Sequence, residues 1–230
     1  DQKFGMSLQP GTAALAGLEE AELEHWGVEA SDSYAALAAA ILNATDSLDF
    51  RGIHCHIGSQ IFEAEGFEQA ATTALEFMNR LNRDLGVTLP ELDLGGGYGI
   101  GYTEADHPRS ITDVTESIAA SVAATCERLG MEIPHMSFEP GRSISGPSGT
   151  TLYTVGTIKN VSIEDENGEI RVRRYVSVDG GMSDNARPVL YESDYSVTLA
   201  NRAPAGEQVL SRVVGKHCES GDVVVRYCYL

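Results

Sequence analysis

The sequence predicts an α/β protein that continues into a β-rich part: the later half of a (β/α)8 barrel, followed by part of a β-sandwich or β-barrel-like domain. Strand-like and helical stretches alternate through the first 143 residues, which is typical of parallel βαβ units. After residue 143 the pattern is strand-like and contains no helix of any length. We therefore expect two domains, residues 1–143 and 144–230.

The elements expected in the first domain are strands separated by helices of ordinary length. Thr112 is the expected N-cap of the last helix, and Gly86 and Gly130 are expected to end the last two helices. In chain order we expect a strand at 3–7, a helix at 33–43, a strand at 48–57, a helix at 66–85, a strand at 89–94, a helix at 112–129 and a strand at 133–138.

The second domain is expected to consist of strands. Two of them, at 151–162 and 169–179, flank Asn167-Gly168, which is a strong signal for a β-hairpin turn. Two more are expected at 208–216 and 222–230.

Four βα units make only half of an eight-stranded barrel. Residue 1 falls inside a strand-like pattern, and the last strand-like stretch stops without a turn residue. We therefore expect a fragment that lacks the N-terminal half-barrel and the C-terminal end, in preference to a smaller α/β sheet. We also expect the 230 residues by themselves to be inactive.

Composition excludes several classes of protein. With 42% hydrophobic and 22% charged residues the chain reads as an ordinary globular protein. The formal charge of -18 argues against a nucleic-acid partner, which requires a basic surface. We expect no membrane span, because no apolar stretch has the necessary length, and no signal-peptide pattern is visible. A cytoplasmic location is the default expectation.

The four cysteines do not suggest a disulfide framework. Cys55 lies in an apolar run and Cys126 in an expected helix, so both should be core thiols. Cys218 lies in a polar, glycine-containing loop between His217 and Glu219, where a reactive thiol is favoured over a structural one.

Apolar runs that end in glycine and a reactive polar group occur three times before residue 143, ending near Ser59, Gly95 and Glu139. Polar chemistry at the carboxyl ends of successive parallel strands is how a βα-barrel builds an active site. This pattern indicates an enzyme. The run Gly95-Gly96-Gly97 would allow backbone N–H groups to approach a phosphate closely, or could be a tight strand-to-helix turn.

Two further groups of residues have alternative interpretations. In Glu139-Pro140-Gly141-Arg142 the carboxylate could meet a cationic ring nitrogen and the guanidinium an anion, or the two could form a structural salt bridge. His54 and His56 are expected on one face of a strand, as in some metal-dependent hydrolases. We expect no metal site, because the other histidines lack suitable positions, and a His56 ring stacked on a planar cofactor fits better.

Five ordered motifs together resemble the fold-type III pyridoxal-phosphate decarboxylases, and most closely the branch that acts on diaminopimelate. They cover most of the chain: His56-Ile57-Gly58-Ser59; Leu92-Asp93-Leu94-Gly95-Gly96-Gly97; Glu139-Pro140-Gly141-Arg142; Asp179-Gly180-Gly181-Met182-Ser183-Asp184-Asn185-Ala186-Arg187-Pro188-Val189-Leu190-Tyr191; and Cys218-Glu219-Ser220-Gly221-Asp222.

The resemblance implies a pyridoxal 5'-phosphate cofactor, decarboxylation of meso-2,6-diaminopimelate to L-lysine and CO2, and a homodimer with shared active sites. It implies that His56 stacks on the cofactor ring and that Glu139 pairs with its nitrogen. The remaining implied cofactor contacts, chiefly to the phosphate, are Ser59, Gly95, Gly96, Gly97, Gly141 and Arg142.

The resemblance also implies substrate contacts. Arg142, Arg187 and Tyr191 would bind the distal carboxylate of an amino-acid substrate, and Glu219 its distal ammonium. Cys218 would be the catalytic proton donor and would enter from the partner subunit. An ornithine- or arginine-type decarboxylase is the alternative, but the Arg187–Tyr191 pair favours diaminopimelate, because a distal carboxylate needs a cation to receive it.

The chain departs from the family pattern in one respect. The lysine that joins the cofactor covalently should lie on an early barrel strand, and the lysines present are Lys3, Lys159 and Lys216, none in that context. A catalytically dead regulatory relative is therefore a second alternative. Retention of Glu139 and Cys218 speaks against it.

Overall fold

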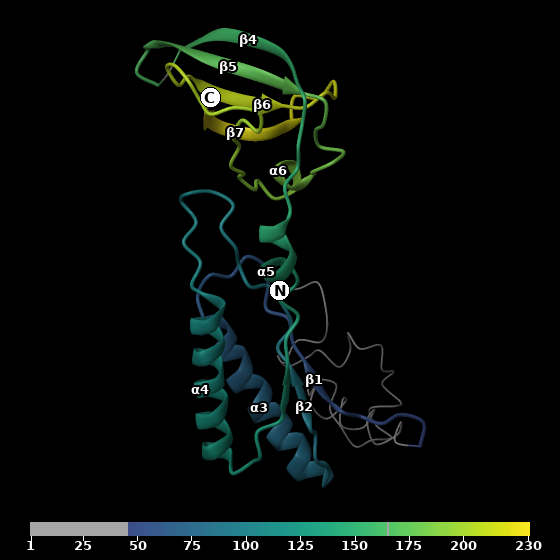
Figure 1. Ribbon diagram of the computed structural model, residues 1–230. Helices are drawn as coiled ribbons and strands as arrows, with labels where there is room; N and C mark the ends of the chain where they lie inside the picture. The colour runs from purple at the N-terminus through teal and green to yellow at the C-terminus, as the bar shows by residue number, and fades with distance from the viewer. Residues whose placement is uncertain (1–45, 165) are drawn as a thin grey trace. The chain divides into compact units, whose positions relative to one another are not determined.

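The computed structural model describes residues 46–164 and 166–230, and they form two compact units (Figure 1). The first comprises the described residues up to Ile100 together with Pro108–Pro147, and the second comprises Gly101–His107 and the described residues from Ser148 to Leu230. The strand expected at 3–7 and the helix expected at 33–43 lie outside the described residues.

The first unit contains a parallel three-stranded sheet in the order β1-β2-β3. Its strands are β1 (Gly52–His54), β2 (Glu91–Asp93) and β3 (His135–Ser137), and each is followed in the chain by a helix or a turn. Helix α3 (Glu65–Leu85) connects β1 to β2, and α4 (Ile111–Leu129) connects β2 to β3. The βαβ units expected from the sequence are therefore confirmed in this region.

The strands are shorter than the apolar runs at 48–57, 89–94 and 133–138 that predicted them. Backbone hydrogen bonds continue one residue past the strand ends, from Cys55 N–H to the Asp93 carbonyl (2.9 Å) and from Leu94 N–H to the Ser137 carbonyl (3.1 Å). Beyond that point the chain turns away toward the glycines. The apolar side chains extend further than the ladder because they pack on the helices after the strand pairing has ended.

The helix ends follow local capping chemistry. Gly86 and Gly130 adopt left-handed backbone conformations (φ 65° and 66°) and end α3 and α4 as expected. The expected N-cap Thr112 was wrong. Ser110 caps α4, because its extended backbone (ψ 146°) lets its side chain accept a hydrogen bond from Asp113 N–H at 3.1 Å.

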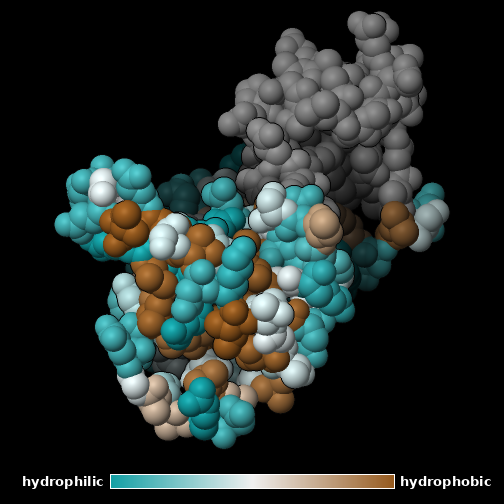
Figure 2. All heavy atoms as spheres, turned by 90° about the horizontal axis from the view of Figure 1, so that it is seen from above, coloured by the Kyte–Doolittle hydropathy of each residue, from teal (hydrophilic) through white to brown (hydrophobic). Residues whose placement is uncertain are grey.

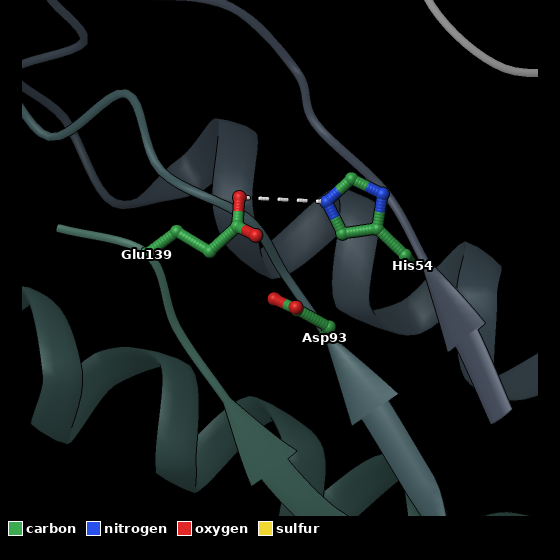
Figure 3. A group of neighbouring side chains, drawn as sticks. All are labelled: His54, Asp93 and Glu139. Atoms are coloured by element: carbon green, nitrogen blue, oxygen red, sulfur yellow. Dashed lines mark ion pairs between the residues drawn. The ribbon is translucent and has the colours of Figure 1, made fainter. Parts of the chain in front are cut away.

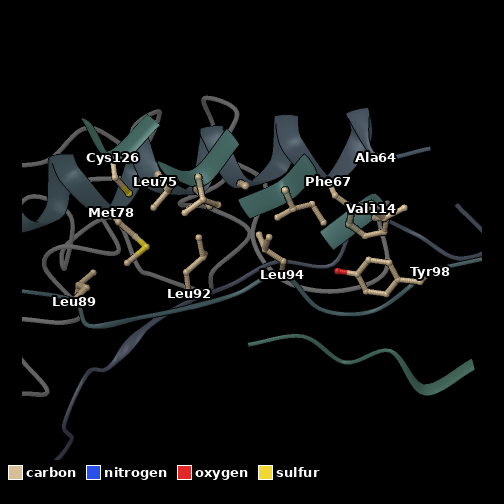
Figure 4. Packing of buried hydrophobic residues seen from close by; sticks show 14 of the residues in the cluster. Ala64, Phe67, Leu75, Met78, Leu89, Leu92, Leu94, Tyr98, Val114 and Cys126 are labelled. Carbon is tan, nitrogen blue, oxygen red and sulfur yellow. The ribbon is translucent and has the colours of Figure 1, made fainter. Parts of the chain in front are cut away.

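The core of the first unit lies where α3 and α4 pack on β2 (Figure 4). Phe67, Leu75 and Met78 from α3, and Leu92 from β2, are at most 1% exposed. Cys126 of α4 is also 1% exposed, and Cys55 packs against the same cluster, so both are core thiols as expected. Removing this apolar area from water is the main force that fixes the helices over the sheet.

The second unit contains a four-stranded sheet in the order β4-β5-β6-β7. Its strands are β4 (Val155–Glu164), β5 (Ile170–Val178), β6 (Leu210–Val214) and β7 (Val223–Tyr229). The β4–β5 and β6–β7 pairs are antiparallel, whereas β5 and β6 run parallel. The hairpin expected at Asn167-Gly168 is confirmed. In the space-filling view of Figure 2, apolar side chains lie between polar ones on the visible face.

Short helices complete the described structure. Helix α5 (Gly141–Ser145) and the 3-10 turn η2 (Gly146–Ser148) follow β3, and α6 (Arg187–Leu190) lies between β5 and β6 in the chain. Within the described residues, every helix is too short or too polar to cross a membrane.

Candidate active site

Three polar side chains meet at the carboxyl edge of the parallel sheet (Figure 3). His54 and Asp93 are the last residues of β1 and β2, and Glu139 lies two residues beyond β3. Because parallel strands end at the same edge, the sheet brings these side chains together. His54 Nε2 lies 3.6 Å from Glu139 Oε2, and one ligand-type atom from each of the three residues lies within 4.8 Å of the others.

The glycine run after β2 is tied to both neighbouring strand ends. Gly95 N–H donates to Asp93 Oδ1 (2.8 Å) and Gly96 N–H to His56 Nδ1 (3.3 Å). Glu139 N–H donates to the Gly95 carbonyl at 2.9 Å. Strand β1 ends at His54, so His56 lies beyond it. The expectation that both histidines share one strand face was wrong, and their rings contact different groups.

Side chains are excluded at these glycines. A Cβ on Gly96 would lie 2.3 Å from the Glu139 carbonyl oxygen, and one on Gly97 would lie 2.3 Å from the Gly58 carbonyl oxygen. Gly97 also has a φ of +102°, which strongly favours glycine. The run is thus a tight turn whose backbone is packed against both adjacent strand ends, and it is also free of side-chain bulk.

A polar cluster next to the turn contains a cation. Arg142 donates to Ser59 Oγ (3.0 Å) and to Gln60 Oε1 (2.7 Å). The Gln60 side chain also donates to the Ile100 carbonyl at 2.6 Å, and its backbone is left-handed (φ 62°). A guanidinium and a serine hydroxyl that meet beside glycine N–H groups are groups that bind phosphate.

Sequence reasoning missed His54, Asp93 and Gln60 as members of this site. The position of Asp93 at the end of an apolar run was the available signal for it, and Gln60 directly follows Ser59. His54, Asp93 and Glu139 are also groups of the kind that ligate divalent cations. In the structure Glu139 pairs with His54, and Arg142 donates to Ser59 and Gln60.

Two ionisable groups beneath the site are held neutral. Burial, reinforced by the charge of Asp93, raises the pKa of the Cys55 thiol to about 11. Burial, then the charges of Cys55 and Asp93, raises the pKa of Tyr98 to about 12. The Tyr98 ring stacks on Phe67 with centroids 4.4 Å apart. Cys55 is therefore a protonated, unreactive thiol at neutral pH.

In the second unit, the expected substrate residues Arg187 and Tyr191 lie at the two ends of α6. The Arg187 guanidinium carbon lies 5.2 Å from the centre of the Tyr191 ring. Arg187 Nε is buried, and within the part of the chain that the structure describes it has no hydrogen-bond acceptor. A buried donor of this kind has capacity for an anionic ligand.

Cys218 and Glu219 lie in the loop between β6 and β7, and both are exposed. The loop is anchored by Asp222, a buried side chain that accepts a hydrogen bond from His217 N–H at 2.7 Å. His56, Ser59, the three glycines, Glu139, Gly141 and Arg142 thus belong to the first unit. Arg187, Tyr191, Cys218 and Glu219 belong to the second.

Known proteins with similar sequences are diaminopimelate decarboxylases. The chain is 47% identical over 225 residues to the enzyme of Corynebacterium efficiens, covering 98% of this chain and 43% of that protein. It is 41% identical over 230 residues to that of Mycobacterium tuberculosis, covering 98% of this chain and 46% of the relative. The chain therefore spans less than half the length of these curated relatives.

Solved structures agree with this assignment at the level of fold. Diaminopimelate decarboxylase from Helicobacter pylori, complexed with L-lysine, matches with a TM-score of 0.62 and 25% identity, covering 98% of this chain and 49% of the other. A lysine/ornithine decarboxylase from Vibrio vulnificus matches with a TM-score of 0.63 over 87% of this chain and 50% of the other, at 22% identity, which shows the fold alone.

The family described as pyridoxal-dependent decarboxylase, pyridoxal binding domain, matches residues 9–146. That range contains the strand ends, the glycine turn and the Ser59–Arg142 cluster. The chain belongs to the pyridoxal-dependent decarboxylases.

Proposed function

We propose that this chain is part of a pyridoxal-phosphate-dependent decarboxylase that converts meso-2,6-diaminopimelate to L-lysine and CO2. The support is the sequence identity of 41% and 47% to proteins of that name, together with the family match. The observation that carries the proposal is the arrangement of Glu139 beside a glycine turn and an arginine–serine pair at one sheet edge.

The residues of the first unit fit this cofactor. The turn at Gly95-Gly96-Gly97 has no side chains to obstruct a phosphate, and Ser59 and Arg142 already meet at 3.0 Å beside it. We assign the phosphate to these five residues with Gly141, which follows Glu139 closely in the chain. The His56 ring lies against the same turn through its 3.3 Å contact with Gly96 N–H, and we assign it to stacking on the cofactor ring.

Glu139 is assigned to the cofactor's ring nitrogen. A carboxylate there accepts a hydrogen bond from the protonated nitrogen and favours that protonation state. When bound, pyridoxal phosphate supplies an electron sink for the bond that breaks. Keeping its nitrogen protonated is the contribution of Glu139 to that chemistry. The side chain is 58% exposed, so its carboxylate is open to a ligand.

The second unit is assigned to the substrate. Arg187 and Tyr191, with Arg142, would bind the distal carboxylate, and Glu219 would bind the distal ammonium. The Cys218 thiol would donate its proton to the substrate's α-carbon after CO2 has left, which forms a C–H bond and leaves a thiolate. We infer that Cys218 enters the site from the second subunit of a homodimer.

We further propose that the first unit is the later half of a βα-barrel and that the second is part of the β-domain, with the division near residue 143. The parallel β1-β2-β3 order with helical connections supports the first assignment. An ornithine- or arginine-type activity has weaker support, because the similarity to decarboxylases of those names is structural, at 17% to 25% sequence identity.

The test is CO2 release from the complete protein, supplied with pyridoxal phosphate, on meso-diaminopimelate, ornithine, arginine and lysine in parallel. We expect turnover of meso-diaminopimelate with stoichiometric L-lysine. Replacing Arg187 by Leu should raise the KM for meso-diaminopimelate far more than that for any substrate without a distal carboxylate. Preferential turnover of ornithine or arginine by the wild type would overturn the assignment.

A further inference from the structure

Asp222 is a buried carboxylate that the proposed chemistry does not use. Its residue is 3% exposed, and among the residues that the structure describes it is the only buried Asp, Glu, His, Lys or Arg. A buried charge is expensive unless hydrogen bonds compensate it, so the contacts of this side chain require an explanation.

The two oxygens of Asp222 bind two different segments. Oδ1 accepts the N–H of Met182 at 2.6 Å, and Oδ2 accepts the N–H of His217 at 2.7 Å. Met182 lies in the loop that leads from β5 to Arg187 at the start of α6, whereas His217 directly precedes Cys218. One carboxylate therefore joins the two loops that carry the candidate substrate and proton-donating residues.

Further contacts reinforce the same junction. Lys216 N–H donates to the Gly180 carbonyl at 2.9 Å, and His217 Nε2 lies 2.8 Å from Ser183 Oγ. Glycines make room for the carboxylate. A Cβ on Gly215 would lie 2.2 Å from Asp222 Oδ2, and one on Gly181 would lie 2.5 Å from Oδ1.

We propose that Asp222 is a positioning residue, which fixes the Cys218–Glu219 loop relative to the segment that carries Arg187 and Tyr191. The inference deepens the proposed function and rests on it, because it assumes that these two segments serve one substrate. Asp222 touches neither substrate nor cofactor in this role. It acts by holding the backbone N–H groups of Met182 and His217, whereas residues that follow them in the chain bind the substrate and donate the proton.

The first test is Asp222→Asn in the complete holoenzyme. An amide keeps one acceptor oxygen but turns an NH2 group toward the second backbone N–H, so one loop loses its anchor. With a displacement on the order of 1 Å, kcat should fall about 10²-fold. Pyridoxal-phosphate binding should be retained, because the assigned cofactor residues belong to the other unit. Retained kcat in a folded variant overturns the proposal, and parallel loss of cofactor binding overturns it in favour of a general structural role.

Asp106→Asn is the matched control. Asp106 lies in the same unit, and its Oδ2 alone accepts the N–H groups of Tyr102 (2.9 Å) and Thr103 (2.8 Å). The amide oxygen of asparagine can keep both bonds, so this variant makes the same change of side chain without freeing a loop. We expect its kcat to match that of the wild type. Gly215→Ala provides a second route to the same defect, because its methyl group displaces the Asp222 carboxylate without changing its charge.

A readout without substrate separates this inference from the proposed function. Without Asp222 as acceptor, the N–H groups of Met182 and His217 lose their hydrogen bonds, so amide hydrogen exchange at these two positions, measured by mass spectrometry, should be several-fold faster in Asp222→Asn and in Gly215→Ala. The Asp106→Asn rate should equal that of the wild type. An unchanged rate in both of the first two variants overturns the positioning role, whereas failure of the wild type to decarboxylate diaminopimelate overturns the proposed function only.

Discussion

Gly96→Ala should damage both stability and activity, because the new methyl group has no room. Its Cβ would lie 2.3 Å from the Glu139 carbonyl oxygen, about 1 Å inside the 3.4 Å at which ordinary contact begins. The obstacle is backbone, and it is held by the hydrogen bond from Glu139 N–H to the Gly95 carbonyl. Overpacking of this kind costs about 1–3 kcal/mol in the free energy of unfolding.

The same displacement moves Glu139 itself. A shift of about 1 Å at a residue assigned to the cofactor should lower kcat about 10²-fold. Denaturant unfolding and CO2 release from the complete protein measure the two effects. Gly66→Ala is the control. Gly66 lies in α3, and a Cβ there would make an ordinary 3.4 Å contact with the Ile57 side chain. This substitution should be neutral or should stabilise the protein by up to about 1 kcal/mol. A folded Gly96→Ala protein with wild-type kcat would refute the proposed position of Glu139.

Three further outcomes are expected. Glu139→Gln should lower kcat by about 10²-fold with little change in substrate affinity, because protonation of the cofactor's ring nitrogen matters mainly in the transition state. A change in KM alone, measured by steady-state kinetics, would contradict this. Cys218→Ala and a variant that lacks the cofactor-binding lysine should each be inactive as homodimers, and mixing them should restore roughly a quarter of wild-type activity. About half of the dimers would then be mixed, and each mixed dimer would have one working site of two. No recovery under proven subunit exchange would place Cys218 in its own chain's site. The raised pKa of Cys55, from 9.0 to about 11, means that the folded state keeps a proton that the unfolded chain releases. The buried thiol therefore contributes its full stabilisation below about pH 9, and this contribution is lost as the pH rises through about 11. The difference in free energy of unfolding between the wild type and Cys55→Ala should narrow across that window. A difference that stays constant would mean that the thiol is not buried.

The sequence predicted α3 and α4 well, because the ends of these helices depend on local chemistry. Gly86 and Gly130 end helices through left-handed backbone conformations that depend on the residue itself. The prediction of Thr112 as N-cap failed because Ser110, two residues earlier, can also cap a helix, and the path of the backbone decides which residue does so. Strand lengths failed for a different reason, since the extent of a ladder depends on its neighbours.

The family resemblance assigned Ser59 and Arg142 to one candidate site, although they belong to different motifs. They lie 83 residues apart, and their 3.0 Å contact was not itself predicted, because it depends on the tertiary structure. His54 and Asp93 were missed because their importance comes from the parallel register that places them beside Glu139. Asp222 is the last residue of the motif that begins at Cys218, but its burial and its hydrogen bonds to two loops depend on the tertiary structure.

The packing of the glycine turn has an evolutionary consequence. Gly96 and Gly97 are required by the carbonyl oxygens of Glu139 and Gly58, which are main-chain atoms that any residue at those positions would supply. A descendant that lost its cofactor would thus remain under selection to keep these glycines merely to fold. The Glu139 and Arg142 side chains carry no such obligation. In a genome survey, a retained glycine triplet would therefore reveal ancestry, and the side chains around it would reveal whether the chemistry survives.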